Sequence, residues 1–259
     1  MFTATDIPFL IQLIRFLHTS LHKKPEKWLT LIREKITFFI AQIEYLLANC
    51  LNVELLQLLF QYLNDVLYLD EELAPHFLSD GDDSNFITAI CQACVQILTE
   101  IDQDNGEDIH DADRNVQFFY NFWFILEIIT RNIGDDYNCN RLLDFRDVGE
   151  LFLRFATCQL FINFESSNSL NSFSAACACL NRLIRNDGNE TENISTLFRQ
   201  TMAIDRLKLT FDKSMAILSD QHWPTTSIHR DDDDEGLILH NLRANIDRLY
   251  RYLFSSSHQ

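Results

Sequence analysis

The residues best suited to chemistry in this chain are the His-Asp doublet at His110-Asp111. In a metal-dependent hydrolase, such a doublet works together with further His and Asp ligands carried on facing helices. Here the doublet falls inside the acidic stretch 102–113, which we interpret as a polar loop. A solvated loop is therefore the preferred interpretation, and a metal site there is the alternative.

The same stretch carries a group of carboxylates with the composition of a calcium loop. An EF-hand loop needs Gly at its sixth position and a Glu at its twelfth, but the nearest register puts Gly106 at the fifth and supplies no terminal Glu. We expect no calcium site from these residues, which are Asp102, Asp104, Glu107, Asp108, Asp111 and Asp113.

The seven cysteines are an odd number without the spacing of a disulfide framework. Cys91 and Cys94 have redox-like or zinc-like spacing, but they lie in an apolar helical stretch without a second pair. Apolar helical stretches also surround four others, so we expect reduced core thiols of an intracellular protein. The six in question are Cys50, Cys91, Cys94, Cys158, Cys177 and Cys179.

Other catalytic signatures are missing from the sequence. It contains neither a Gly-rich phosphate loop nor a Gly-x-Ser-x-Gly elbow. We therefore predict that the chain is not an enzyme and needs no cofactor and no metal. The alternative is a helical metal-dependent hydrolase that uses His110-Asp111.

Composition favours a helical protein of one large domain or two small ones. The chain has 259 residues, 47% of them hydrophobic, with only 6 Gly and 4 Pro, too few for the turns of an all-β protein. A net charge of -17 argues against direct nucleic-acid binding, which needs a basic surface. The acidic surface either suits a basic partner or serves solubility.

Apolar residues at helical spacing predict the elements that would position any site. A first helix begins near Asp6 and Pro8, and a second begins at Pro25 and continues to Leu47. Further helices are expected at 53–69, 72–77, 86–101, 116–133, 141–145, 147–163, 169–185, 194–203 and 206–218. The helix at 116–133 is apolar on several faces and is expected to be central.

We divide the chain into a helical domain at 1–218, an acidic linker at 219–236 and an amphipathic helix at 237–259. Arg243, Arg248 and Arg251 lie opposite or beside the apolar stripe of this last helix. The helix either caps the domain or docks into a partner's groove.

The sequence also bears on the compartment. Its start lacks an apolar run with a cleavage site, and no stretch approaches the roughly 20 apolar residues of a membrane span. We expect an intracellular protein without membrane contact, either cytoplasmic or nuclear.

Three long helical segments, 55–69, 118–132 and 172–186, repeat one pattern: a strongly apolar helix, an acidic or Asn-rich turn, then a shorter helix. This order resembles the armadillo and HEAT repeats of importin-α and β-catenin-like proteins. The resemblance implies a short right-handed helical solenoid with capping helices. In peptide-binding members, a Trp is followed four residues later by an Asn on the inner surface. The matching pairs here are Phe60 and Asn64, Trp123 and Glu127, and Cys177 and Asn181.

The resemblance implies a non-catalytic scaffold or adaptor, a subunit of a larger complex that binds a basic peptide or an amphipathic helix of a protein partner. Its candidate contact residues are Asn64, Trp123, Glu127 and Asn181 on the inner face, together with the three Arg of the last helix. Asn64 and Asn181 stand out because a polar residue on an apolar helix needs a partner. The oligomeric state is open, and a homodimeric structural protein is a third interpretation.

Overall fold

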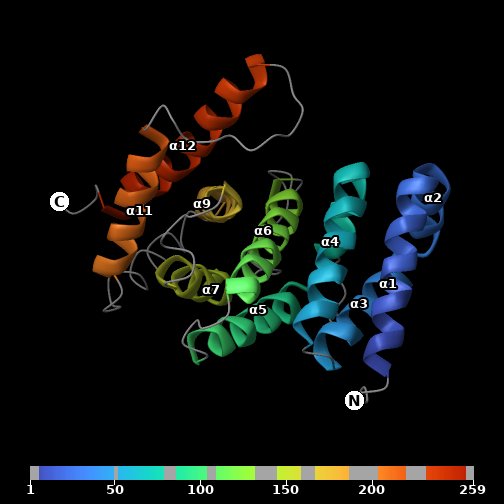
Figure 1. Ribbon diagram of the computed structural model, residues 1–259. Helices are drawn as coiled ribbons and strands as arrows, with labels where there is room; N and C mark the ends of the chain where they lie inside the picture. Colours follow the sequence, from blue (N-terminus) through green and yellow to red (C-terminus); the bar gives the residue numbers. More distant parts are fainter. Residues whose placement is uncertain are drawn as a thin grey trace.

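The computed structural model describes residues 6–49, 52–78, 86–103, 109–131, 145–158, 167–186, 204–219 and 232–254, and these are almost entirely helical, without a strand (Figure 1). The all-α prediction is confirmed. The helices are α1 (Asp6–Lys23), α2 (Pro25–Glu34), α3 (Ile36–Asn49), α4 (Val53–Leu69), the 3-10 helix η1 (Glu71–Leu78), α5 (Phe86–Gln103), α6 (Ile109–Arg131), α7 (Phe145–Thr157), α9 (Ser167–Asn186), α11 (Ile204–Ser219) and α12 (Asp232–Phe254).

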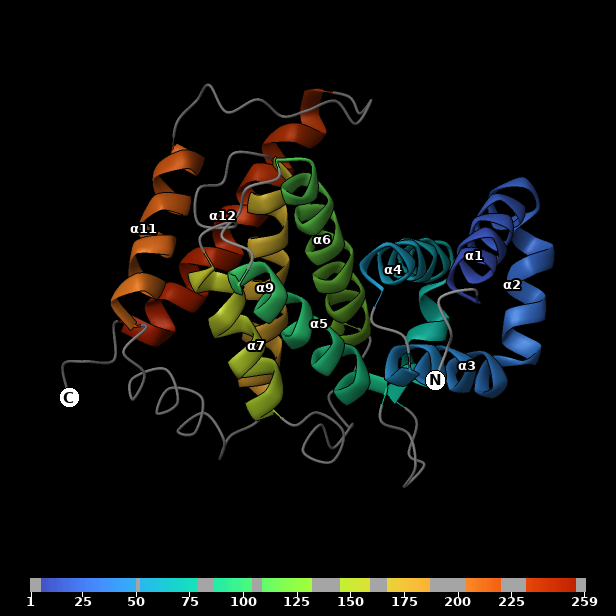
Figure 2. The same cartoon turned by 60° about the horizontal axis from the view of Figure 1, so that its bottom comes forward.

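The helices form two layers. In the first, α1 packs on α4, α4 on α6, α6 on α9 and α9 on α12, so each helix follows its neighbour across the molecule (Figure 2). In the second, α3 packs on α5, α5 on α7 and α7 on α11, and η1 joins the layers beside α4 and α6. The three long segments that share the repeat pattern are therefore neighbours in one layer. They correspond to α4, α6 and α9.

The bounds of α4 agree with the prediction at both ends, and a capping interaction explains its start. The side chain of Asn52 accepts a hydrogen bond from the backbone N–H of Leu55 at 2.9 Å, which satisfies a donor of the first turn. The helix ends at Leu69, and the carboxylate of the next residue, Asp70, pairs with the Nε of Arg33 at 2.7 Å, which joins α2 to the end of α4.

The prediction of a single helix from Pro25 to Leu47 is wrong, because the helix is interrupted at Lys35. The backbone of Lys35 leaves the helical region, and its N–H bonds to the carbonyl of Ile32 at 3.1 Å. The break leaves α2 against α1 while α3 packs onto α5 and η1. Lys35 is neither Gly nor Pro, so tertiary packing rather than local sequence accounts for it.

Two helices begin inside acidic runs that we interpreted as loop and linker. Helix α6 begins at Ile109 instead of Val116, so His110-Asp111 lies in its first turn and not in a polar loop. Helix α12 begins at Asp232 instead of Leu237, and Gly236 lies within it. Acidic residues are favoured in a first helical turn by the helix dipole, which explains both differences.

The core is one contiguous cluster that extends from α1 to α12. Aromatic rings connect its parts: Phe60 of α4 stacks on Phe118 of α6 at 4.8 Å, and Trp123 of α6 lies 5.4 Å from Phe155 of α7, centroid to centroid. The contacts continue through Phe152, Phe173, Phe211 and Phe254, which belong to α7, α9, α11 and α12. As expected, α6 is buried on several faces and is central.

Five of the described cysteines are buried thiols that form no disulfide, as predicted: Cys91, Cys94, Cys158, Cys177 and Cys179. Cys50 lies outside the described residues. Burial raises the pKa of Cys94 and Cys177 well above the ordinary thiol value and raises the pKa of Cys179 to about 12. These thiols are therefore protonated and weakly nucleophilic at neutral pH.

We expect the buried thiols to react with an aromatic disulfide reagent at least about a hundredfold more slowly in the folded protein than in denaturant. The measurement uses a Cys50→Ser/Cys139→Ser variant, which keeps the five described thiols. Reaction should stay slow when the pH rises to about 9, the region where an ordinary thiol ionises. Rapid labelling of the native protein would show that these side chains are accessible.

Two further predictions lie outside the described residues: the short helix at 141–145, apart from Phe145 itself, and the helix at 194–203. Among the described helices, none combines the length and apolar character needed to cross a bilayer.

Candidate interaction surface

Trp123, a predicted contact residue, lies wholly inside the protein. Its side chain has no exposed surface and contacts the rings of Phe122, Phe152 and Phe155. The indole N–H has no hydrogen-bond acceptor among the described residues. A partner therefore cannot reach this ring without unfolding the core, and we remove it from the candidate surface.

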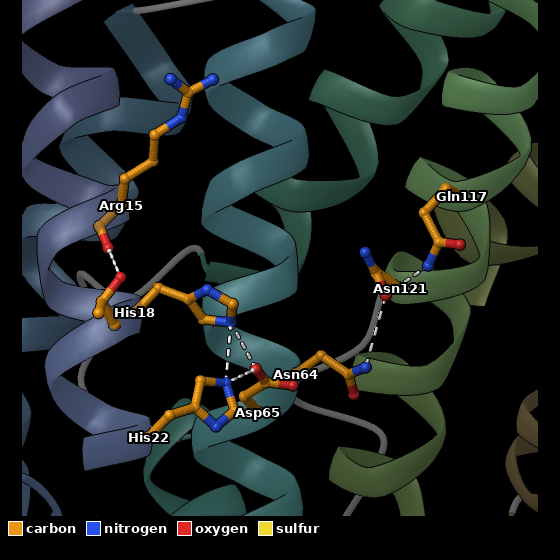
Figure 3. A network of polar contacts seen from close by, with 8 residues as sticks. Arg15, His18, His22, Asn64, Asp65, Gln117 and Asn121 are labelled. Carbon is orange, nitrogen blue, oxygen red and sulfur yellow. Dashed lines mark hydrogen bonds and ion pairs between the residues drawn. The ribbon is translucent and has the colours of Figure 1, made fainter. Parts of the chain in front are cut away.

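Asn64 takes part in a chain of amide contacts between neighbouring helices. Its Nδ2 donates to Oδ1 of Asn121 at 3.5 Å, and Nε2 of Gln117 donates to the same oxygen at 3.3 Å (Figure 3). Gln117 in turn accepts from Nδ2 of Asn168 at 2.9 Å. We call these four residues the amide ladder, and it joins α4, α6 and α9. The Nδ2 of Asn64 thus finds a partner within the chain, whereas its buried Oδ1 has none among the described residues.

Asn181 likewise has an internal partner. It is buried on α9, and its Nδ2 donates to the backbone carbonyl of Asn245 on α12 at 2.8 Å. Asn245 also donates to Oγ of Ser174 at 3.4 Å. Ile246, Leu249 and Leu253 of α12 join the core, so α12 covers the face of α9 that carries Asn181.

Glu127 is held by arginines from two helices. Its carboxylate pairs with Arg182 of α9 at 2.5 Å and with Arg131 of its own helix at 3.3 Å. Arg182 also donates to the backbone carbonyl of Glu127 at 3.1 Å. These contacts join α6 to α9, so the charge of Glu127 is largely neutralised inside the protein.

The arginines of the last helix face solvent. Arg243, Arg248 and Arg251 are exposed on α12, and Arg251 pairs with Asp247 one turn away at 2.8 Å. Of the predicted contact residues, these three are exposed, whereas Asn64 and Glu127 are partly buried and Trp123 and Asn181 are buried.

The structure also places an apolar stripe on the outer face of α1 that we did not identify from the sequence. Phe9, Leu13 and Phe16 have 69%, 41% and 62% of their surfaces exposed. Their spacing puts them on one side of the helix, whereas Ile11, Ile14 and Leu21 are buried. We call these three exposed side chains the α1 stripe.

Large exposed apolar side chains that form a contiguous patch mark interaction sites in soluble proteins. Phe38 of α3 and Leu31 of α2 are also exposed, so all three N-terminal helices present apolar surface. The sequence signal was available: α1 has apolar residues on two faces, more than one buried interface requires.

The charge around the stripe differs in sign from the rest of the chain. Residues 6–49 contain six Lys or Arg and four Asp or Glu, whereas the remaining residues contain 15 basic and 34 acidic side chains. The α1 stripe therefore belongs to a mildly basic part of a strongly acidic protein.

His110 and Asp111, the residues of the alternative hydrolase interpretation, are helical, but their side chains lie outside the described part of the structure. Comparison of the chain with protein families, curated proteins and solved structures finds no match.

Proposed function

We propose that this chain is a short armadillo/HEAT-like solenoid that acts as a non-catalytic interaction subunit and binds an amphipathic helix of a protein partner along the α1 stripe. The exposure of Phe9, Leu13 and Phe16 carries the proposal. The solenoid architecture is supported by the two layers, in which each helix packs on its neighbours, because stacked repeats share that arrangement.

The shape of the stripe favours a helical occupant. Its residues span about 10 Å along α1 at the rise of an α-helix. A straight apolar ridge of this kind pairs with apolar side chains that recur at helical spacing on a second helix. Two exposed Phe rings supply the large contact areas that are typical of interface cores.

The charge pattern favours a different protein over a second copy of this chain. A symmetric dimer through the α1 stripe would bring together two units in which basic residues outnumber acidic ones. A partner helix whose apolar face is flanked by Asp or Glu would be attracted instead. The basic peptide expected from the total charge suits other parts of the surface.

The decisive experiment introduces a photocrosslinking amino acid at Leu13 and, as a matched control, at Leu209. Leu209 is also an exposed Leu, but it lies on α11 at the other end of the molecule. Crosslinking in native extract, followed by peptide mapping, should identify one helical segment of another protein at position 13 that is absent at position 209. Crosslinks to this chain itself, or identical crosslinks from both positions, would contradict the proposal.

Once the partner segment is identified, a Phe9→Ala/Phe16→Ala variant should bind it at least about tenfold more weakly, because exposed aromatic anchors dominate such interfaces. Fluorescence anisotropy with the labelled segment measures the change. A Leu209→Ala variant should bind like the wild type. Equal binding by all three proteins would place the contact elsewhere.

A further inference from the structure

Three potential metal ligands meet between α1 and α4. The Nε2 atoms of His18 and His22 lie 2.5 Å and 2.8 Å from the same oxygen, Oδ2 of Asp65, and 3.2 Å from each other (Figure 3). All three ligand atoms are within 4.8 Å of one another. The described residues contain no other group of three or more His, Cys, Asp or Glu side chains in such an arrangement.

Helix geometry accounts for the convergence. His18 and His22 are four residues apart, so both imidazoles lie on the same face of α1. That face packs on α4, which supplies Asp65. The α1 stripe lies on another face of α1, so this cluster and the interaction surface do not share residues.

The ligand set matches a particular class of metal. Two imidazoles and a carboxylate suit Zn²⁺, which is bound by three or four protein ligands. Tetrahedral Zn²⁺ with bonds of about 2.0–2.1 Å separates neighbouring ligand atoms by about 3.3 Å. The 3.2 Å between the two Nε2 atoms is close to this value, and small side-chain rotations would bring Oδ2 of Asp65 to it.

Exposure allows a metal to enter and a water to complete its shell. The side chain of His22 is 56% exposed, whereas His18 and Asp65 are about half as accessible. A Zn²⁺ ion would have three ligands from the protein and a fourth position open to solvent.

We propose that His18, His22 and Asp65 form a Zn²⁺ site that fastens α1 to α4. The site would add to a contact made by buried apolar side chains of both helices and by the ion pair between Arg15 and Glu54 at 3.0 Å, which is half exposed and adds little stability. The bound metal fixes the position of the helix that carries the α1 stripe. The competing arrangement is a hydrogen-bonded trio in which both imidazoles donate to Asp65 and no metal binds.

The test titrates the full chain, first freed of metal with a chelator, with zinc chloride against a chromophoric competitor. We expect one equivalent to bind. The variants His18→Gln and Asp65→Asn should each lose at least about tenfold in affinity, because each removes a ligand. His76→Gln serves as the matched control, since His76 is an exposed His of η1 outside the cluster, and it should bind like the wild type.

Two further measurements make the outcome decisive. Zn²⁺ should raise the denaturation midpoint of the wild type but not that of Asp65→Asn, because a ligand of the native state stabilises it. A His110→Gln variant tests the other candidate doublet and should retain the ion. Any of three results would overturn the proposal. The wild type could fail to bind Zn²⁺, a helical His18→Gln/His22→Gln variant could retain the ion, or His110→Gln alone could lose it.

Discussion

Replacing Trp123 with Ala should lower the free energy of unfolding by about 3–5 kcal/mol, the cost of removing a large aromatic side chain from a packed core. The side chain is fully buried and contacts rings of both α6 and α7, so the cavity would open between the two layers. Urea unfolding followed by far-ultraviolet circular dichroism measures the change.

Two further variants make the Trp123 experiment specific. Trp123→Phe should cost only about 1–2 kcal/mol, because the cavity is smaller and the lost N–H has no acceptor among the described residues. Phe38→Ala, at an exposed ring of α3, should change stability by less than about 0.5 kcal/mol. A Trp123→Ala protein as stable as the wild type would show that this ring lies at a surface, as the sequence interpretation supposed.

Replacing Arg182 with Met should cost about 2 kcal/mol, because it leaves the mostly buried carboxylate of Glu127 with Arg131 as its one cation partner among the described residues. This loss of stability is smaller than that expected for a fully buried ion pair, since the side chain of Arg182 is 31% exposed. Arg251→Met is the matched control. Its pair with Asp247 is exposed, so the same substitution should cost less than about 0.5 kcal/mol.

Adding Glu127→Gln to Arg182→Met should recover part of the lost stability, because the unpaired buried charge disappears. Chemical denaturation of the single and double variants gives the coupling energy between the two residues. If Arg182→Met and Arg251→Met cost the same, the contact between Glu127 and Arg182 would contribute no more than a surface pair.

The sequence predicts helices well where a cap and an apolar period agree. Helix α4 has both, with Asn52 before it and Leu55, Leu59 and Leu63 along it, and its predicted bounds are those of the structure. The sequence prediction fails at the starts of α6 and α12, which lie in acidic runs. An acidic run is equally typical of a loop and of the first turn of a helix. The interruption of the helix at Lys35 depends on the packing of α3 against other helices, and the local sequence pattern carries no information about that packing.

In the candidate sites, too, the sequence predicts local features but not which distant residues become neighbours. The sequence indicates that Asn64 and Asn181 need hydrogen-bond partners, but only the fold shows that Asn121 and Asn245 supply them. His18 and His22 have a recognisable metal-ligand spacing on one helix. Their third member, Asp65, lies more than forty residues away and becomes a neighbour only when α1 packs on α4.

The amide ladder has a consequence for how the helices of the first layer are aligned along their axes. Apolar ridges repeat at every turn, so a purely apolar interface tolerates a slip of one turn, about 5.4 Å, with modest loss. Such a slip of α6 would separate Asn121 from Asn64 and Gln117 from Asn168, and would remove the interhelical hydrogen bonds of the buried Asn121 and of three partly buried amides. The ladder therefore selects a single alignment of α4, α6 and α9, and it distinguishes that alignment from neighbours that bury nearly the same apolar surface.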